Sequence, residues 1–351
     1  MSQKFSLLNF LGRPFSPIYS TVMKGREALY RKGIKKSHSL GVPVISVGNL
    51  TMGGTGKTPL VAHIASKLLA KGFKPAIISR GYGGAAGNKV NIVSDGNEVF
   101  LDAKTAGDEP CFLAHSLPGV HVYTGIVRIL PSRFAAEKAG CNVLILDDGF
   151  QHLAVKRDLD LVLFSAASLA GNSRVFPGGD LREPISALKR SSAFVITGIT
   201  EELRERSSKF KEILLQRFPD IPVFFASYEA RQAQLLTDMS SCALPTLPSP
   251  LFAFCGIGQP QLFQKTLTAL DSDICGFMPL RDHQAFTPSL LKKINAKAKK
   301  SGAQALITTE KDLVKIRKEH FTLPVFSLQM EVHPEQNFTD FLNMQINGFK
   351  P

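Results

Sequence analysis

One stretch, "NLTMGGTGKTPL" at residues 49–60, constrains the fold of this chain more than any other feature. It follows the apolar run "VPVISVG" and precedes residues 59–71, whose apolar positions recur with helical spacing. A buried strand, a glycine-rich turn and a helix in this order are typical of phosphate-binding loops in parallel α/β sheets. The stretch therefore predicts such a loop and, with it, a parallel sheet.

The residue types of this loop suit the binding of a nucleotide. Glycines let backbone N–H groups converge on phosphate oxygens, and the N-terminus of the following helix favours anions. Lys57 would reach the β- and γ-phosphates, and Thr58 would hold Mg²⁺. The usual G-x-x-x-x-G-K-[ST] pattern has a glycine at position 51, but G-G-x-G-K-T keeps the converging amides. The expected nucleotide contacts are Thr51, Met52, Gly53, Gly54, Thr55, Gly56, Lys57 and Thr58.

Strand-like and helix-like segments alternate along the rest of the chain. Helices are predicted over 108–116 and 129–139, and a hairpin turning at Asp95-Gly96 is predicted in "NKVNIVSDGNEVF". The predicted strands are "KPAIIS", "VHVYTG", "CNVLILDDG", "LDLVLFSA" and "SAFVITG". This rhythm predicts an α/β fold: a P-loop NTPase-like parallel sheet with helices on both faces, plus a second, smaller α/β domain.

Changes in composition suggest the domain boundaries. The chain becomes rich in Pro and Ser near 227–250, ending in "LPTLPSP", and α/β segments then resume with helices at 260–270 and 288–301. We therefore predict an N-terminal segment at 1–36, a P-loop domain at 37–226, a linker at 227–250 and a smaller α/β domain at 251–351.

The composition is that of a globular protein with reduced thiols. Of 351 residues, 44% are hydrophobic, and no apolar run reaches the roughly 18 residues that span a membrane. The N-terminus does not form a plain signal peptide. An odd number of cysteines without a C-x-x-C pair predicts structural thiols rather than a zinc site. They are Cys111, Cys141, Cys242, Cys255 and Cys275.

The chain is basic, with a net charge of +13. Such a charge attracts nucleic acid, anionic membranes or anionic substrates, and it also promotes solubility, so charge alone does not choose among them. In residues 1–36 an apolar stripe with helical spacing is followed by a basic cluster, although Pro14 and Pro17 should break or kink a helix there. Two interpretations stay open: docking on an anionic membrane, or packing on the protein's own core. The stripe consists of Leu8, Leu11, Phe15, Ile18, Tyr19, Val22 and Met23.

Several carboxylates are suited to metal binding. Asp147 and Asp148 follow the apolar run 143–146, so we expect them at the carboxyl edge of the sheet, where this fold class binds ligands. The turn-rich "FPGGDLREP" adds Glu183 as a further metal or substrate contact.

Two pairs of adjacent residues have a structural and a catalytic interpretation. Asp108 and Glu109 begin a predicted helix, where aspartate is a good N-cap, yet either could accept a proton from a substrate hydroxyl. In "LRDHQAF", Asp282 precedes His283, and this pair is by itself as consistent with a surface histidine as with a proton relay. "TTEKD" does not match the guanine-specific N/T-K-x-D pattern, which favours ATP.

Eight short motifs occur in the order found in the tetraacyldisaccharide 4'-kinase (lipid A 4'-kinase) family, which the chain resembles. They lie between residues 47 and 312 and read "VGNLTMGGTGKTP", "SRGYGG", "AGDEP", "DDGFQH", "LREP", "FCGIGQP", "DHQAF" and "TTEKD". The resemblance implies a kinase that transfers the γ-phosphoryl group of ATP, with Mg²⁺, to the 4'-hydroxyl of tetraacyldisaccharide 1-phosphate. It also implies two α/β domains that close on the nucleotide.

The resemblance further implies roles for individual residues. Asp108 would be the catalytic base, His283 would assist it, and Lys57 would neutralise charge. Asp147 and Asp148 would come before Glu183 as metal ligands. The protein would lie peripherally on the cytoplasmic face of the inner membrane, with residues 1–36 on the anionic surface. The family often reads P-A-G-P-L-R-E where this chain has "PGGDLREP", and often has a second histidine where this chain has Gln284.

Two other functions compete with this interpretation. A switch-type or partitioning P-loop ATPase shares the glycine loop, but usually carries a lysine where this chain has Met52. A DNA-binding ATPase would explain the charge, but the sequence contains neither a helix-turn-helix pattern nor interleaved aromatic and basic residues, so we expect no nucleic-acid partner. The sequence leaves the oligomeric state open.

Overall fold

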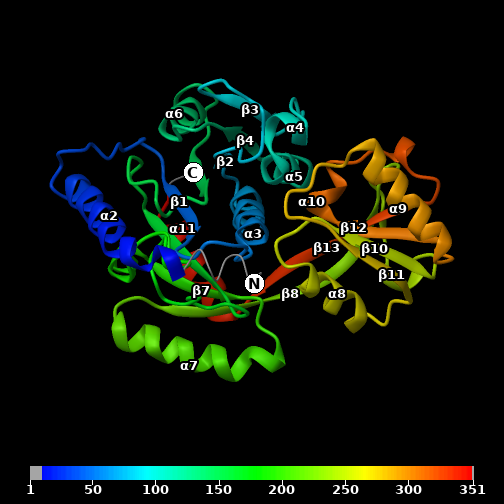
Figure 1. Cartoon of the computed structure of the whole chain (residues 1–351). Coiled ribbons are helices and arrows are strands. Elements are labelled where there is room, and N and C mark those ends of the chain that lie inside the picture. The colour runs from blue at the N-terminus through cyan, green and yellow to red at the C-terminus, as the bar shows by residue number, and fades with distance from the viewer. Residues whose placement is uncertain (1–9, 350–351) are drawn as a thin grey trace. The chain divides into compact units, whose positions relative to one another are not determined.

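The computed structural model describes residues 10–349, so Leu8 of the predicted stripe lies outside the described residues. The chain forms two compact units (Figure 1). Unit 1 consists of Met1–Arg80, Gly119–Tyr228 and Val332–Pro351, and unit 2 consists of Gly81–Pro118 and Glu229–Glu331.

These units differ from the predicted consecutive domains. Residues 81–118, expected in the P-loop domain, group with the later part of the chain, and residues 332–351 group with unit 1. The predicted linker at 227–250 begins inside a strand, Val223–Leu235, and continues through a short strand at Ser241–Cys242. The chain passes between units several times, and a change in composition along the sequence does not record such crossings.

Unit 1 is built on parallel strands in the order β8, β7, β6, β1, β5, β2 and β4, each paired in parallel with the next. The strands are β1 (Val44–Asn49), β2 (Pro75–Ser79), β4 (His121–Thr124), β5 (Val143–Asp147), β6 (Leu159–Ser165), β7 (Ala193–Thr197) and β8 (Val223–Leu235), of which β8 belongs to this unit up to Tyr228. Its helices are η1 (Arg13–Phe15), α2 (Ser16–Arg31), α3 (Lys57–Ala70), α6 (Ile129–Glu137), η2 (Ile185–Arg190), α7 (Glu201–Arg217) and α11 (Gln336–Asn347).

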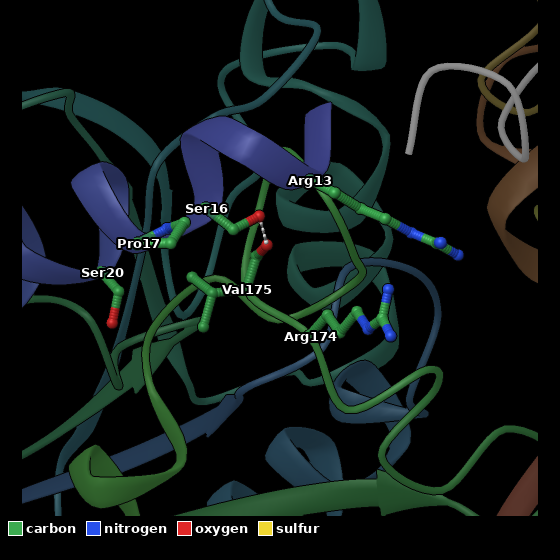
Figure 2. A pocket seen from close by; sticks show the side chains of 6 residues that line it. All are labelled: Arg13, Ser16, Pro17, Ser20, Arg174 and Val175. Atoms are coloured by element: carbon green, nitrogen blue, oxygen red, sulfur yellow. Dashed lines mark hydrogen bonds between the residues drawn. The ribbon is translucent and has the colours of Figure 1, made fainter. Parts of the chain in front are cut away.

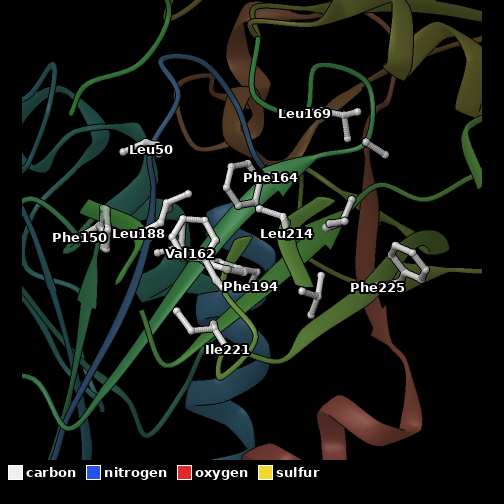
Figure 3. Packing of buried hydrophobic residues seen from close by; sticks show 14 of the residues in the cluster. Leu50, Phe150, Val162, Phe164, Leu169, Leu188, Phe194, Leu214, Ile221 and Phe225 are labelled. Atoms are coloured by element: carbon white, nitrogen blue, oxygen red, sulfur yellow. The ribbon is translucent and has the colours of Figure 1, made fainter. Parts of the chain in front are cut away.

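Helices cover both faces of this sheet, as predicted. Successive side chains of a strand point to opposite faces. In β8, Val223 and Phe225 belong to the core cluster that includes α7, whereas the ring of Phe224 between them contacts Phe338 of α11. The aromatic centre of the α7 cluster includes Phe164 and Phe194, whose rings meet edge to face (Figure 3).

Unit 2 repeats the α/β arrangement with the parallel strand order β11, β10, β12 and β13. In β10, Phe252 and Phe254 pack with α9, and Leu251 and Ala253 pack with α8, so helices again cover both faces. The strands of the unit are β3 (Asn91–Asp95), β9 (Ser241–Cys242), β10 (Leu251–Cys255), β11 (Ile274–Pro279), β12 (Ala305–Thr309) and β13 (Val325–Pro334), of which β13 belongs to this unit up to Glu331. The helices are α4 (Ala103–Ala106), α5 (Asp108–Ser116), η3 (Leu244–Thr246), α8 (Pro260–Ala269), α9 (Pro288–Lys300), α10 (Glu310–Leu313) and η4 (Lys318–His320).

The N-terminal helix α2 is not broken by its prolines. Pro14 lies in the preceding 3₁₀ turn and Pro17 lies at the start of α2. Proline is tolerated in the first turn of a helix because the N–H it lacks has no intrahelical partner there. The predicted break is therefore a helix start.

Candidate functional site

The glycine-rich loop joins β1 to α3 in unit 1. Every residue of β1 is buried, and α3 begins at Lys57 directly after Gly56. Gly53 has φ 110° and Gly56 has φ 69°, a region of backbone conformation that favours glycine. A Cβ atom on Gly56 would lie 1.5 Å from the hydroxyl of Tyr228, so both conformation and space require glycine at this position.

Hydrogen bonds from two neighbouring segments hold the loop. The side-chain amide of Asn49 donates to the carbonyl of Thr51 at 2.7 Å, and the N–H of Met52 donates to the carbonyl of Asp180 at 2.7 Å. Thr51 also forms an antiparallel bridge with Leu181. The "FPGGDLREP" segment thus contacts the glycine loop through its backbone.

Lys57 faces a carboxylate that follows β5. Its Nζ atom lies 3.4 Å from Oδ1 of Asp148, and Arg182 donates to Oδ2 of Asp148 at 2.7 Å. Burial alone would raise the pKa of Asp148, but the charges of Lys57 and Arg182 outweigh it and lower the pKa to about 2. Asp148 is therefore ionised at neutral pH and paired with two cations.

Asp147 and Thr58 lie at the same edge of the sheet. Asp147 ends β5, in register with Val47 of β1, and Oγ of Ser79 donates to its Oδ2 at 3.1 Å. Asp147 is 1% exposed, and Thr58 in the first turn of α3 is 3% exposed. Both side chains thus belong to elements that flank the glycine loop, and their role as metal ligands stays a prediction.

Arg128 is a residue of this site that the sequence analysis missed. It is buried, and its guanidinium donates to the backbone carbonyl of Asp148. Its own N–H lies 3.3 Å from Nε2 of His152, and burial together with the charge of Arg128 lowers the pKa of His152 to about 4. The imidazole is therefore neutral at pH 7 and accepts this hydrogen bond. Arg128 belongs to no motif, and only its place at the start of a helix beside the sheet edge could have indicated it.

Glu183 faces arginines. Its Oε2 lies 2.6 Å from Nη2 of Arg190, and its Oε1 lies 3.7 Å from Nη1 of Arg26. Arg190 also pairs with Glu27 at 3.0 Å, so this network around the buried Glu183 ties α2 to η2. The metal role predicted for Glu183 competes with these ion pairs.

Unit 2 brings Asp108 and His283 together. Nδ1 of His283 lies 3.1 Å from Oδ2 of Asp108, and Nζ of Lys315 lies 3.2 Å from the same oxygen. Asp108 is the first residue of α5, and Gly107 (φ 94°) is the N-cap, so the predicted capping role for Asp108 is wrong. The aspartate side chain instead faces the histidine of the "DHQAF" motif.

Charge and burial oppose each other at this pair. Burial would raise the pKa of Asp108, but hydrogen bonds from His283 and Lys315 outweigh it and lower the pKa below its ordinary value. The hydrogen bond to Asp108 raises the pKa of His283, against the effect of burial. The arrangement thus favours an ionised carboxylate beside a histidine that protonates readily.

The "TTEKD" motif supports this pair. Asp312 is fully buried and accepts hydrogen bonds from the N–H of Gly256 and the hydroxyl of Thr309, each at 2.8 Å. Nζ of Lys315 lies 2.7 Å from Asp312 and so bridges it to Asp108. The sequence analysis missed Lys315, which lies three residues after the last residue of the motif.

The exposed face of α2 is apolar. Leu11 and Phe15, which precede α2, and Ile18 and Val22 within it are each 60–64% exposed. Oγ of Ser16 donates to the carbonyl of Val175 at 2.8 Å, beside a small hollow from which Arg13 and Arg174 extend in the same direction (Figure 2). Leu11, Phe15, Ile18 and Val22 of the stripe therefore do not pack on the protein's own core, whereas Tyr19 between them contacts Phe176 and Arg182.

Other features of the described residues bear on the predicted class of protein. All five cysteines are free. Within residues 10–349, no three His, Cys, Asp or Glu side chains form a cluster suited to a metal ion. Over the same residues, no helix is long and apolar enough to cross a membrane.

Comparisons with known proteins agree on one family. The family described as "Tetraacyldisaccharide-1-P 4'-kinase" matches residues 8–347. The chain is 47% identical to the tetraacyldisaccharide 4'-kinase of Desulfotalea psychrophila, over 97% of each chain. It is 38% identical to that of Syntrophus aciditrophicus, over 92% of this chain and 89% of the relative.

A solved structure has the same fold. The crystal structure of LpxK from Aquifex aeolicus in complex with ATP is similar, with a TM-score of 0.76 and 31% sequence identity. The similarity covers 96% of this chain and 98% of that one. The predicted fold class is therefore confirmed.

Proposed function

The chain belongs to the tetraacyldisaccharide-1-P 4'-kinase family, and we propose which of its residues hold the nucleotide, activate the acceptor and meet the membrane. It is an ATP-dependent lipid kinase of lipid A biosynthesis that transfers the γ-phosphoryl group to the 4'-hydroxyl of tetraacyldisaccharide 1-phosphate. The predicted family, fold and activity are confirmed, and a switch-type ATPase is not favoured.

The proposed nucleotide site rests mainly on one observation. Lys57 is paired with Asp148 directly beside the glycine loop, whose conformation at position 56 leaves no room for a side chain. Residues 51–58 surround the phosphates, and the N–H groups at the start of α3 meet their oxygens. Lys57 exchanges its contact with Asp148 for the β- and γ-phosphates when ATP binds.

The donor set at the end of β5 fits Mg²⁺, a hard cation that prefers oxygen ligands. Thr58, Asp147 and Asp148 would hold it, and the ion would neutralise charge on the transferring phosphate. For Glu183 we propose a structural role instead, because its two oxygens face Arg190 and Arg26.

Asp108 accepts the proton of the acceptor hydroxyl in our proposal. The 4'-oxygen forms a bond to the γ-phosphorus, the bond from that phosphorus to the bridging oxygen of ADP breaks, and the proton moves to Asp108. His283 and Lys315 both contact Oδ2, which leaves Oδ1 as the oxygen that receives the proton. The lowered pKa of Asp108 suits a loose transition state, in which the hydroxyl loses its proton late.

A kinase assay in detergent micelles tests the reaction and the roles together. With labelled ATP, Mg²⁺ and tetraacyldisaccharide 1-phosphate, the wild type should produce a labelled bis-phosphorylated lipid. Asp108→Asn should bind ADP as the wild type does and lose about 100-fold or more of kcat, the range of general base catalysis. Lys57→Ala should weaken the binding of ADP itself.

The outcomes separate the alternatives. ATP consumed without labelled lipid would point to the switch-type ATPase for this chain. Asp108→Asn turnover within a few fold of wild type would mean that Asp108 only organises the start of α5.

We also propose that α2 lies on the anionic cytoplasmic surface of the inner membrane. Its apolar stripe is exposed while polar contacts such as the hydrogen bond from Tyr19 to the carbonyl of Arg182 hold the other face. Arg13 and Arg174 lie beside it, and each basic residue near an anionic surface contributes about 1 kcal/mol of binding.

Vesicle binding tests this docking. The double variant Phe15→Ser/Ile18→Ser should bind vesicles containing phosphatidylglycerol several-fold more weakly than wild type, with an unchanged melting temperature. Ile213→Ser is the matched control, because Ile213 is 56% exposed on α7. Equal losses in both variants would contradict a specific role for α2.

A further inference from the structure

The hydroxyls of the buried Thr197 and the partly buried Tyr228 donate hydrogen bonds to consecutive carbonyls of the glycine loop, and neither belongs to the roles proposed above. Oγ1 of Thr197 donates to the carbonyl of Thr55 at 2.8 Å. The hydroxyl of Tyr228 donates to the carbonyl of Gly56 at 3.1 Å. Thr197 ends β7 and Tyr228 lies in β8, so both donors come from strands of the sheet in unit 1.

Because the peptide bond is planar, these two hydrogen bonds also restrict the orientation of the neighbouring N–H groups. In a trans peptide, the C=O and N–H groups point in opposite directions. Fixing the carbonyls of Thr55 and Gly56 therefore also fixes the N–H groups of Gly56 and Lys57, on the side away from the two hydroxyls. These amides lie at the N-terminus of α3, and the first N–H groups of a helix are free to bind an anion because they have no partner within the helix.

Hydrogen bonds that order the loop matter here because glycine, among all residues, allows the backbone the most conformations. Gly53, Gly54 and Gly56 leave many backbone conformations accessible, and ordering each of them opposes binding. Thr197 is 1% exposed, and its Oγ1 also lies 3.3 Å from the carbonyl of Phe164 in β6. Burial raises the pKa of Tyr228 to about 12, so its hydroxyl keeps its proton and remains a donor.

We propose that Thr197 and Tyr228 are positioning residues that orient the Gly56 and Lys57 amides toward the nucleotide phosphates before ATP arrives. This inference rests on the proposed role of residues 51–58 and adds the groups that give the loop its shape. The space at Gly56 fits it, since the Tyr228 hydroxyl occupies the place that a side chain at position 56 would need.

Competition binding with ADP and adenosine tests the inference without relying on turnover. Both ligands carry the same nucleoside, but only ADP carries phosphates. Tyr228→Phe and Thr197→Val each remove one hydroxyl and keep the shape of the side chain. We expect each to weaken ADP about tenfold, the value of one hydrogen bond with an unsatisfied partner left behind, and to leave adenosine within twofold of wild type.

Three further variants make the result decisive. Thr197→Ser keeps the hydroxyl and should restore ADP binding. Tyr123→Phe is the matched control, because Tyr123 is a buried tyrosine whose hydroxyl lies 2.9 Å from His121 in β4 instead of at the loop. Lys57→Ala reports on the loop itself.

The possible results distinguish the two claims. ADP affinity within twofold of wild type in Tyr228→Phe and Thr197→Val, with a loss in Lys57→Ala, would overturn the positioning role and leave the phosphate loop in place. Wild-type ADP affinity in Lys57→Ala as well would instead overturn the proposed role of the loop. Equal losses of ADP and adenosine would assign the two hydroxyls to folding alone, and the stoichiometry of the titration measures the folded fraction.

Discussion

His283 and Asp108 are 175 positions apart in the sequence, yet their side chains lie 3.1 Å apart. The hydrogen bond to Asp108 is the largest cause of the raised pKa of His283, so Asp108→Asn should return that pKa toward its ordinary value near 6.5. NMR titration of the imidazole measures it. His115, whose pKa is lowered by burial alone, is the control in the same unit and should not change. An unchanged His283 titration in Asp108→Asn would contradict the pairing.

The raised pKa of His283 also determines how the stability of the fold depends on pH. Because the folded pKa of His283 is raised, its protonation stabilises the fold fully below the unfolded pKa, and that contribution is lost as the pH rises through the folded pKa. His283→Gln should therefore be less stable than wild type mainly on the acid side of this window. Melting temperatures of both proteins across the window check the direction.

Lys315 sets the acid limit of activity if it holds Asp108 ionised. Its Nζ lies between Asp108 and the fully buried Asp312, and only about a tenth of its side chain is exposed. Lys315→Gln should raise the pKa of Asp108 and move the acid limb of the kcat/KM profile to higher pH. Lys315→Arg keeps the positive charge and should keep the profile. A lower rate with an unmoved acid limb in Lys315→Gln would indicate a purely structural lysine.

Gly12, which precedes η1, and Gly25 within α2 form a pair of glycines that tests how α2 packs on unit 1. A Cβ on Gly12 would lie 2.4 Å from the carbonyl oxygen of Pro177, whereas a Cβ on Gly25 would meet nothing within 4 Å. Gly12→Ala should therefore push the start of the helix off the 177–178 turn and speed hydrogen exchange of the amides over Ser16–Arg31. Gly25→Ala should slow that exchange, because alanine stabilises a helix interior by about 0.5–1 kcal/mol relative to glycine. Equal exchange in the two variants would mean that the close approach to Pro177 does not fix α2.

The elements themselves were largely predictable, because helix and strand periodicity is local. The predicted helix at 108–116 coincides with α5 (Asp108–Ser116), and the glycine loop lies between a buried strand and α3 as expected. The grouping of residues 81–118 with 229–331 was not predictable, since it depends on contacts between segments far apart in the chain. Of the site, the motif residues could be found from sequence and resemblance. Lys315 and Tyr228 could not, because a lysine near a helix and a tyrosine in a strand carry no signal until the fold brings them to a functional group.

The net positive charge of the whole molecule should increase the rate of the reaction on anionic surfaces. The chain carries 42 Lys and Arg against 29 Asp and Glu, and a field of this sign attracts anionic surfaces over about 10 Å at 0.1 M salt. On micelles containing phosphatidylglycerol, kcat/KM for the lipid acceptor should exceed that on neutral micelles several-fold at low salt. Raising the NaCl concentration from 0.05 to 0.5 M shortens the screening length and should remove most of this difference. Activity on neutral micelles should change little. Initial rates on both surfaces across the salt series measure it. If activity on the two surfaces fell in parallel with salt, the charge would act on ATP or on solubility, and the attraction to an anionic membrane would lose its support.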